Sequence, residues 1–338
     1  MGKQYRNKYM YIYADVFFTK GYNRTLICEP AVNSSWHFIP NEFYETILLF
    51  RNKLIDDIID ENPYNIDVEG LIEYLLKNNY GSLVDDISLF PPIEMKWYSP
   101  HVIENAIIDI DKQSQHDYDK IANELDALLC KNVQIRSYIS IDIFQIEDII
   151  RRFMGHNFES IDFILKFTDN VSHDAYLSLA EYPSVSFIVH SSPQNQFYES
   201  LLHGIYPIVG YVQYTKQIIS SSDCCGIINK DNLVHPTCIH DYVEGVLRNK
   251  CLNKKISIDA DGNIKNCPSM KQCYGNIKST SLVDVCALRK FRSYWFITKD
   301  KIKVCKDCEY RYVCNDCRAF VKHKFDKPKK CNYDPYKS

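Results

Sequence analysis

Residues 106–129 read AIIDIDKQSQHDYDKIANELDALL, a short apolar run, a polar loop and an amphipathic segment. A run of this length is typical of a buried strand, and apolar residues spaced three and four apart are typical of a helix that covers it. The alternation continues along the chain and predicts βαβ units, a parallel sheet and an α/β fold. The expected strands are AIIDI (106–110), VQIRSY (133–138), SIDFILKF (160–167), VSFIVHS (185–191) and PIVGYVQY (207–214), and the expected helices lie in 116–129 and 142–154.

The composition is that of an ordinary globular protein. The chain has 338 residues, 46% hydrophobic and 25% charged, with a formal net charge of −3, so two or three domains are expected. A charge this close to zero gives no overall reason to expect a nucleic acid or a membrane as partner. The start, MGKQYRNKYMYIY (1–13), carries no export signal, and no apolar run approaches the roughly 20 residues of a membrane span. We therefore expect a cytoplasmic protein that binds neither a membrane nor nucleic acid.

Residues 1–95 predict a small α+β domain ahead of the parallel sheet. Two β-prone runs, TLICEP (25–30) and SWHFIP (35–40), flank the polar turn AVNSS (31–35), which is typical of a hairpin. A proline- and aromatic-rich stretch, 88–100, ends the domain as a connector. With two helices after the hairpin, the domain is expected to be winged-helix-like. Those helices are expected in NEFYETILLFRNKLIDDII (41–59) and VEGLIEYLLKNN (68–79).

Fourteen cysteines are present, and nine of them lie in the last 88 residues. In a cytoplasmic protein so many thiols indicate metal binding rather than disulfides. Metal chemistry is therefore expected in the segment 238–338, whose small core would be marginally stable without it. The nine are Cys251, Cys267, Cys273, Cys286, Cys305, Cys308, Cys314, Cys317 and Cys331.

Two CxxC pairs stand close together in CKDCEYRYVCNDC (305–317). Two intervening residues let both thiolates of a pair turn toward one metal site, so a structural zinc ribbon is one interpretation. The five residues between the pairs are few for two opposed zinc knuckles, and a ribbon leaves Cys251, Cys267 and Cys331 without a role. Iron–sulfur clusters that take ligands from several stretches are the other interpretation. On spacing alone both remain open.

The cysteine pattern resembles that of the SPASM domain, which many radical-SAM peptide-modifying enzymes carry. CLNKKISIDADGNIKNC (251–267) is similar to C-x(9–15)-G-x4-C, with Gly262 as the glycine, and residues 305–317 are similar to C-x2-C-x5-C-x3-C apart from a last gap of two. Cys331 stands in the place of the final cysteine. The whole chain resembles one branch, the grasp-with-spasm peptide maturases. The further stretches that carry this likeness are KGYNRTLIC (20–28), FIPNEFYE (38–45), NAIIDI (105–110), CGII (225–228), GNIKSTSL (275–282) and YWFITKDKIKVCKDCEYRYVCNDCRAF (294–320).

The resemblance implies two iron–sulfur clusters, expected to be of the 4Fe–4S type, with zinc as the alternative. The second cluster has three assigned ligands, and its fourth ligand is either another cysteine or absent, which would leave one iron open. The ligands implied for the first cluster are Cys305, Cys308, Cys314 and Cys331, those for the second are Cys251, Cys267 and Cys317, and the candidates for its fourth are Cys225, Cys238, Cys273 and Cys286.

The resemblance also implies an architecture and partners. We expect the α+β domain in 1–95, a degenerate radical-SAM-like partial (β/α) barrel in 100–237 and a SPASM domain in 238–338. The expected function is maturation of a ribosomally made peptide alongside an ATP-grasp ligase, and the alternative is a non-catalytic adaptor that presents the peptide. The leader of the precursor peptide is expected to bind residues 1–95, where RTLIC (24–28) would supply an edge strand and FYETILLF (43–50) a helix beside it.

The sequence lacks the CxxxCxxC motif through which radical-SAM enzymes bind their catalytic cluster. That motif should follow AIIDI, yet DKQSQHDYDK (111–120) contains no cysteine, so we expect no cleavage of S-adenosylmethionine. Several other side chains are candidate catalytic or ligand groups, and for each a structural role explains the pattern equally well or better. These are Asp111, His116 and Asp117 at a helix start, His190 at a strand end, the Cys224–Cys225 pair in a loop, and the basic stretch 320–330 as a solvated face.

Overall fold

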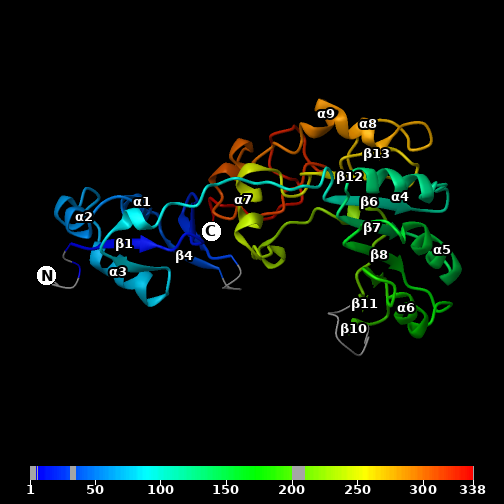
Figure 1. Ribbon diagram of the computed structural model, residues 1–338, viewed down its shortest axis with the longest axis horizontal. Helices are drawn as coiled ribbons and strands as arrows, with labels where there is room; N and C mark the ends of the chain where they lie inside the picture. Colours follow the sequence, from blue (N-terminus) through cyan, green and yellow to red (C-terminus); the bar gives the residue numbers. More distant parts are fainter. Residues whose placement is uncertain (1–4, 6, 31–35, 200–209, 338) are drawn as a thin grey trace.

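The computed structural model describes residues 5, 7–30, 36–199 and 210–337. The N-terminal region lies at one end of the long axis and a large sheet at the other (Figure 1). Helix α7 (Ile239–Leu247) and the C-terminal segment lie between them. The expected mixed α/β fold is confirmed. Within the described ranges, no helix has both the length and the apolar character that a membrane crossing requires.

Eight strands form the large sheet, in the order β10-β11-β9-β8-β7-β6-β12-β13. The six strands from β11 to β12 run parallel, and an antiparallel strand lies at each edge. All five expected strands are found, although positions 207–209 of the last lie outside the described residues. The bounds are β6 (Asn105–Ile110), β7 (Asn132–Ser137), β8 (Ser160–Lys166), β9 (Val185–His190), β10 (Gln196–Glu199), β11 (Tyr211–Tyr214), β12 (Lys255–Ile258) and β13 (Ile264–Lys265).

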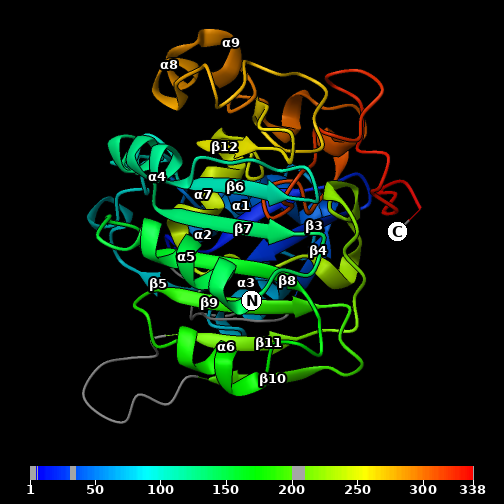
Figure 2. The same ribbon diagram turned by 90° about the vertical axis from the view of Figure 1, so that its right-hand side faces the viewer.

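Three helices cover one face of this sheet, as the face-on view in Figure 2 shows. Strands β6 to β9 lie side by side in chain order, so each parallel connection steps in the same direction. Right-handed crossovers then place the connecting helices on the same face. The two expected helices are confirmed, and aspartates cap both: Asp117 and Asp142 accept the backbone N–H three residues later. The helices are α4 (Tyr118–Ala127), α5 (Ile143–Phe153) and α6 (His173–Leu179).

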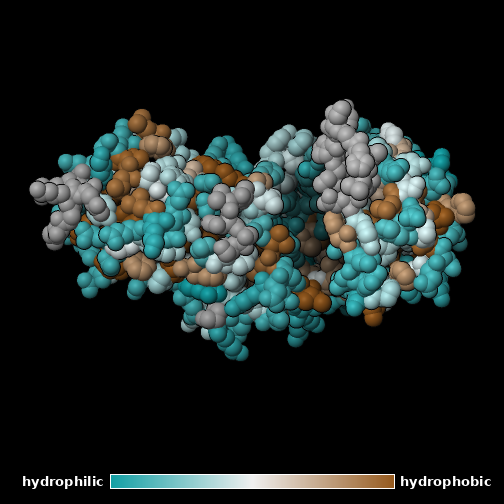
Figure 3. Space-filling model, turned by 90° about the horizontal axis from the view of Figure 1, so that it is seen from below, coloured by the Kyte–Doolittle hydropathy of each residue, from teal (hydrophilic) through white to brown (hydrophobic). Residues whose placement is uncertain are grey.

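The two faces of the sheet differ because strand residues alternate between them. Ile108 and Ile135 are fully buried on the helix-covered face. On the opposite face the same strands carry polar side chains, although helices on both faces would require both to be apolar. This polar face looks toward the N-terminal region, and the space-filling view shows a hollow there (Figure 3). Its polar residues include Asn105 and Asp109 on β6, Gln134 and Arg136 on β7, Ser160 and Asp162 on β8, and Lys255 and Ser257 on β12.

The hydrophobic core of the sheet extends into the cysteine-rich segment. It takes in apolar residues of β12 and of two later helices and reaches Trp295. The expected boundary at 237/238 therefore separates the strands of the middle segment from two strands, β12 and β13, that join the same sheet. The two later helices are α8 (Leu282–Ala287) and α9 (Arg289–Arg292).

The N-terminal region has a separate core and two small sheets. The expected hairpin is confirmed as β3 paired with β4, and its turn, 31–35, lies outside the described residues. The expected helix 41–59 is divided in two, because Leu54 is extended and the Ile55 N–H donates to Lys8 O at 3.0 Å. The elements are β1 (Tyr9–Ile12), β2 (Phe17–Lys20), β3 (Arg24–Cys28), β4 (His37–Pro40), α1 (Tyr44–Leu49), α2 (Ile55–Glu61), α3 (Val68–Lys77) and β5 (Gly81–Val84).

The expectation that RTLIC forms an edge strand is wrong. This stretch is β3, and it pairs with β2 on one side and with β4 on the other. Strand β2 was not predicted from the sequence, and it pairs with the side of β3 that was expected to be free. Leu26 is fully buried at the centre of the sheet. Free strand edges in this region belong instead to β2, β4 and the β1–β5 pair.

Candidate metal centre

Four cysteines of the C-terminal segment line one cavity: Cys305, Cys308, Cys314 and Cys331. We call them the first thiol group. Successive turns bring the first three together, since Cys308 N–H donates to Cys305 O at 3.1 Å and Cys314 N–H to Tyr310 O at 3.0 Å. Cys331 arrives from a separate stretch, which forms a parallel bridge with Ile228. These are the four residues that the resemblance implies for one cluster.

A buried charge network borders the first thiol group. Lys299 Nζ lies 3.3 Å from Cys314 Sγ and 3.2 Å from Asp316 Oδ1. Asp316 also accepts from Arg318 at 2.7 Å and from Asn249 Nδ2 at 2.6 Å. Burial by itself would lower the pKa of Lys299, but the charges of Cys314 and Asp316 raise it. The ammonium group therefore stays protonated beside the sulfurs, where it offsets thiolate charge.

Burial makes the thiols of this group poor acids without a metal. It raises the pKa of Cys305 to about 11, and it raises the pKa of Cys308 and of Cys314 as well. Metal binding requires the thiolate, so a metal bound here would displace the protons.

A second hairpin, formed by β2 and β3 with its turn at residues 21–23, packs against the first thiol group. Arg24 Nε donates to Glu309 Oε1 at 2.9 Å, and Arg311 donates to Lys20 O at 2.6 Å. At the hairpin turn, Tyr22 N–H donates to Asp307 O at 2.7 Å. A methyl group on Gly21 would lie 2.8 Å from Glu309 Cβ, so glycine permits this close approach. The hairpin thus joins residues 305–311 to the N-terminal region.

A second thiol group comprises Cys251, Cys267 and Cys317, beside the polar face of the sheet. Lys255 Nζ lies 3.8 Å from Cys251 Sγ. Burial opposes the charged form of Lys255, but the charges of Cys251 and Cys267 outweigh it and raise its pKa. Burial and the neighbouring Cys251 raise the pKa of Cys267 to about 12. Gly262, at φ +84°, makes the expected turn between β12 and β13 and so returns the chain to Cys267.

The donor sets fit the cofactor that the resemblance implies. Each thiol group is drawn from stretches distant in the sequence, as ligands of iron–sulfur clusters often are. Each also has a lysine ammonium within 4 Å of a sulfur, the buried Lys299 in the first group and the partly buried Lys255 in the second. Across the described ranges, no three or more His, Cys, Asp or Glu side chains converge closely enough to hold a single metal ion. Which metal the thiols hold stays a prediction.

The loop after β6, where a radical-SAM cluster would bind, is tied to the C-terminal segment. Ser114 Oγ donates to Ala260 O at 2.7 Å, and Lys120 Nζ donates to Ile277 O at 2.5 Å. The candidate catalytic side chains of this loop have structural contacts. His116 Nε2 lies 2.8 Å from Asp109 O, Asp111 accepts from Gln113 N–H, and Asp117 caps α4.

The other two candidate groups, His190 and Cys224, also have structural partners. His190 is fully buried, with Nε2 3.1 Å from Ser137 O and Nδ1 3.0 Å from Ser191 Oγ. Burial lowers the pKa of His190, which keeps the ring neutral. Cys224 accepts the Ser220 N–H at 3.4 Å, and backbone hydrogen bonds lower its pKa. Neither arrangement supplies a catalytic pair.

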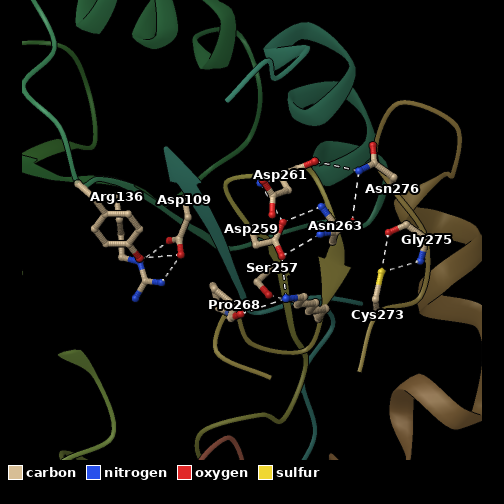
Figure 4. Close-up of polar contacts among 12 residues, drawn as sticks. Asp109, Arg136, Ser257, Asp259, Asp261, Asn263, Pro268, Cys273, Gly275 and Asn276 are labelled. Atoms are coloured by element: carbon tan, nitrogen blue, oxygen red, sulfur yellow. Dashed lines mark hydrogen bonds and ion pairs between the residues drawn. The ribbon is translucent and has the colours of Figure 1, made fainter. Parts of the chain in front are cut away.

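A buried cluster of hydrogen-bonded polar side chains on the polar face was not predicted from the sequence (Figure 4). Arg136 donates to both oxygens of Asp109, at 2.7 and 2.9 Å, and Tyr138 OH donates to Asp109 at 2.6 Å. Arg136 is thus held on the polar face of the sheet by groups of β6 and of the segment that follows β7. In the sequence, this cluster could have been recognised from the polar residues at every second position of the otherwise apolar strands β6 and β7.

Comparison with known protein families finds none that matches the chain, and no curated protein is significantly similar to it.

Proposed function

We propose that this protein takes part in the maturation of a ribosomally synthesised peptide together with an ATP-grasp ligase, and that it uses two SPASM-type 4Fe–4S clusters. The observation that carries the proposal is the convergence of Cys305, Cys308, Cys314 and Cys331 on one cavity. In the same proposal, residues 238–338 form a SPASM domain, the middle segment a degenerate partial (β/α) barrel, and residues 1–95 a winged-helix-like domain. Helices α4, α5 and α6 on one face and polar side chains on the opposite face support the partial barrel.

The proposed clusters would supply electron transfer or a Lewis-acidic iron. Side chains of this protein would bind the clusters and shield them from solvent. The buried Lys299 and the partly buried Lys255 place positive charge beside the thiolates, and the β2–β3 hairpin packs against the first group. Arg136, held by Asp109, places a further cation on the polar face of the sheet.

A second function is that of a non-catalytic adaptor with structural metal sites, iron–sulfur or zinc. The hydrogen bonds that hold the loop after β6 against the C-terminal segment favour this adaptor function. A radical-SAM enzyme places its catalytic cluster there, whereas Ser114, Lys120 and Lys278 fasten this loop region to residues 260–278. The adaptor would present the peptide to the ligase, in the cytoplasm, and cleave no S-adenosylmethionine.

Co-expression tests the proposed function. The cognate precursor and the ATP-grasp ligase are expressed with and without this protein, and the peptide is weighed by mass spectrometry. We expect a mass change that requires all three. A Cys308→Ala variant distinguishes the two roles, since an enzyme that needs its clusters loses the product and an adaptor that stays folded keeps it. An identical product without this protein would refute both.

The leader of the precursor has a candidate binding cavity of about 390 Å³ at the N-terminal region. It lies between β1, β2, α1, the connector and α7, and its lining is largely apolar and aromatic. Phe17 and Tyr242 stack on each other in its wall, with ring centroids 4.2 Å apart. A cavity of this size and character accepts large apolar side chains of a bound peptide.

One strand edge faces this cavity. Tyr13 N–H donates to Tyr80 O, and the β1–β5 register continues that pairing to Tyr11↔Ser82 and Tyr9↔Val84. Because antiparallel pairs alternate, the N–H groups of Met10 and Ile12 point away from β5. Both residues line the cavity. An extended leader could therefore add to β1 as a strand, with alternate side chains in the cavity.

Proline substitutions test this leader site in the full-length protein. We expect the leader to bind with a dissociation constant of about 1 μM. Ile12→Pro removes an outward amide on the cavity side, and we expect binding to weaken about tenfold. Leu83→Pro is the matched control, because its amide points outward from the opposite edge of the same two-stranded sheet. Equal effects of the two substitutions, measured by calorimetry, would exclude β1 as the leader site.

A further inference from the structure

The second thiol group has three assigned cysteines, and the structure discriminates among the four candidates for a fourth. Three are placed elsewhere. Cys286 is buried in the core of the large sheet, and Cys238 precedes α7, whose Tyr242 packs with Leu26 and Cys28 of the N-terminal region. Cys273 Sγ donates to Gly275 O at 3.2 Å and accepts the Gly275 N–H at 3.4 Å, on the opposite side of the β12–β13 hairpin from Asp109 and Arg136 (Figure 4).

Cys225 lies with the second thiol group. Its segment is attached to the turn after Cys267, because Ser269 Oγ donates to Ser222 O at 2.8 Å. Its neighbour Gly226 touches the group directly, since a methyl group there would lie 3.0 Å from Cys317 Sγ. The backbone of Cys225 is fastened as well, with Lys330 Nζ donating to its carbonyl at 3.0 Å.

Lys255 stands on the polar face of β12, and its Nζ lies 3.8 Å from Cys251 Sγ. The contacts of Ser222 with Ser269 and of Gly226 with Cys317 therefore place residues 222–226, with Cys225 among them, beside the second thiol group.

We propose that Cys225 is the fourth ligand of the second cluster, and that the site is closed rather than open. This inference rests on the proposed function only in assuming an iron–sulfur cluster. Cys225 is the exposed member of the set, whereas Cys317 is buried. The iron bound by Cys225 is thus the one that solvent and small ligands can reach.

The test uses the full chain in a Cys308→Ala background, in which the first cluster is disrupted and only the second contributes to the spectra. Iron content, EPR and Mössbauer spectra are compared for Cys225→Ala, Cys238→Ala, Cys273→Ala and Cys286→Ala. We expect Cys225→Ala alone to change the spectra and to lower the iron from about four per chain to about three, since one iron of a cubane loses its protein ligand.

Chemical rescue distinguishes a ligand from a merely structural residue. Because position 225 is exposed, added 2-mercaptoethanol should restore the spectrum of Cys225→Ala. The same thiol should fail to rescue Cys317→Ala, whose position is buried. Spectra unchanged by Cys225→Ala, or changed by one of the other three substitutions, would overturn the assignment while leaving the clusters in place. Iron-free wild-type protein would overturn the assignment together with the proposed cofactor.

Discussion

Anaerobically purified protein is expected to be brown and to contain about eight irons and matching sulfide per chain, and Cys308→Ala is expected to remove about half of both. Cys308 lines the cavity of the first thiol group with Cys305, Cys314 and Cys331. Cys305 and Cys314 are buried, so solvent is less able to replace the missing thiolate here than at the exposed position 225, and the whole cluster is expected to be lost. The second thiol group lies beside the polar face of the sheet and shares no ligand with the first, so its iron should persist.

Cys130→Ala is the matched control for this experiment. Cys130 is also a buried thiol, but it lies in the core of the large sheet and contacts Asn132 O at 3.4 Å. Its loss should leave the iron content unchanged. Iron and acid-labile sulfide are measured on both variants, with zinc determined alongside. Colourless wild-type protein with one or two zinc ions per chain would refute the iron–sulfur interpretation and support the zinc alternative.

Asp316→Ala is expected to lower the free energy of unfolding by about 3–5 kcal/mol, because it removes the carboxylate that two buried cations share. The Asp316 carboxylate accepts from Lys299 and Arg318, and the side chains of all three are almost fully buried. Burial favours the neutral acid, yet the charges of Lys299 and Arg318 outweigh it and lower the pKa of Asp316. The substitution would leave the two cations, Lys299 and Arg318, without this carboxylate next to the first thiol group.

The comparison is with Asp326→Ala. Asp326 pairs with Lys303, whose side chain is 79% exposed, at 3.5 Å, and an ion pair of this kind contributes little. Urea unfolding is followed under anaerobic conditions, with iron measured on the same samples. Equal midpoints for the two variants would show that the Lys299–Asp316–Arg318 network does not stabilise the fold. Asp316→Asn, which retains polar contacts but removes the charge, should fall between wild type and Asp316→Ala.

The α/β class could be predicted from the sequence because its signals are local. Strands β6, β7, β8 and β9 are apolar runs within a few residues of their predicted bounds, and α4 and α5 begin at aspartate caps. These features depend on side-chain alternation and on hydrogen bonds only a few residues apart. The N-terminal region was harder to predict. The break before Ile55 depends on a contact with Lys8, and the central position of β3 depends on β2.

The sequence by itself determined which cysteines are candidate ligands, since CxxC spacing is a local property of the chain. Only the tertiary structure decided how they are grouped. Cys331 joins residues 305–314 through a bridge to Ile228, and Cys225 reaches Cys267 and Cys317 through the contact of Ser269 with Ser222. The lysines beside the sulfurs could likewise not be predicted from the sequence. A lysine is most often solvated, and only packing from distant segments buries Lys299, covers part of Lys255 and makes both of them partners of thiols.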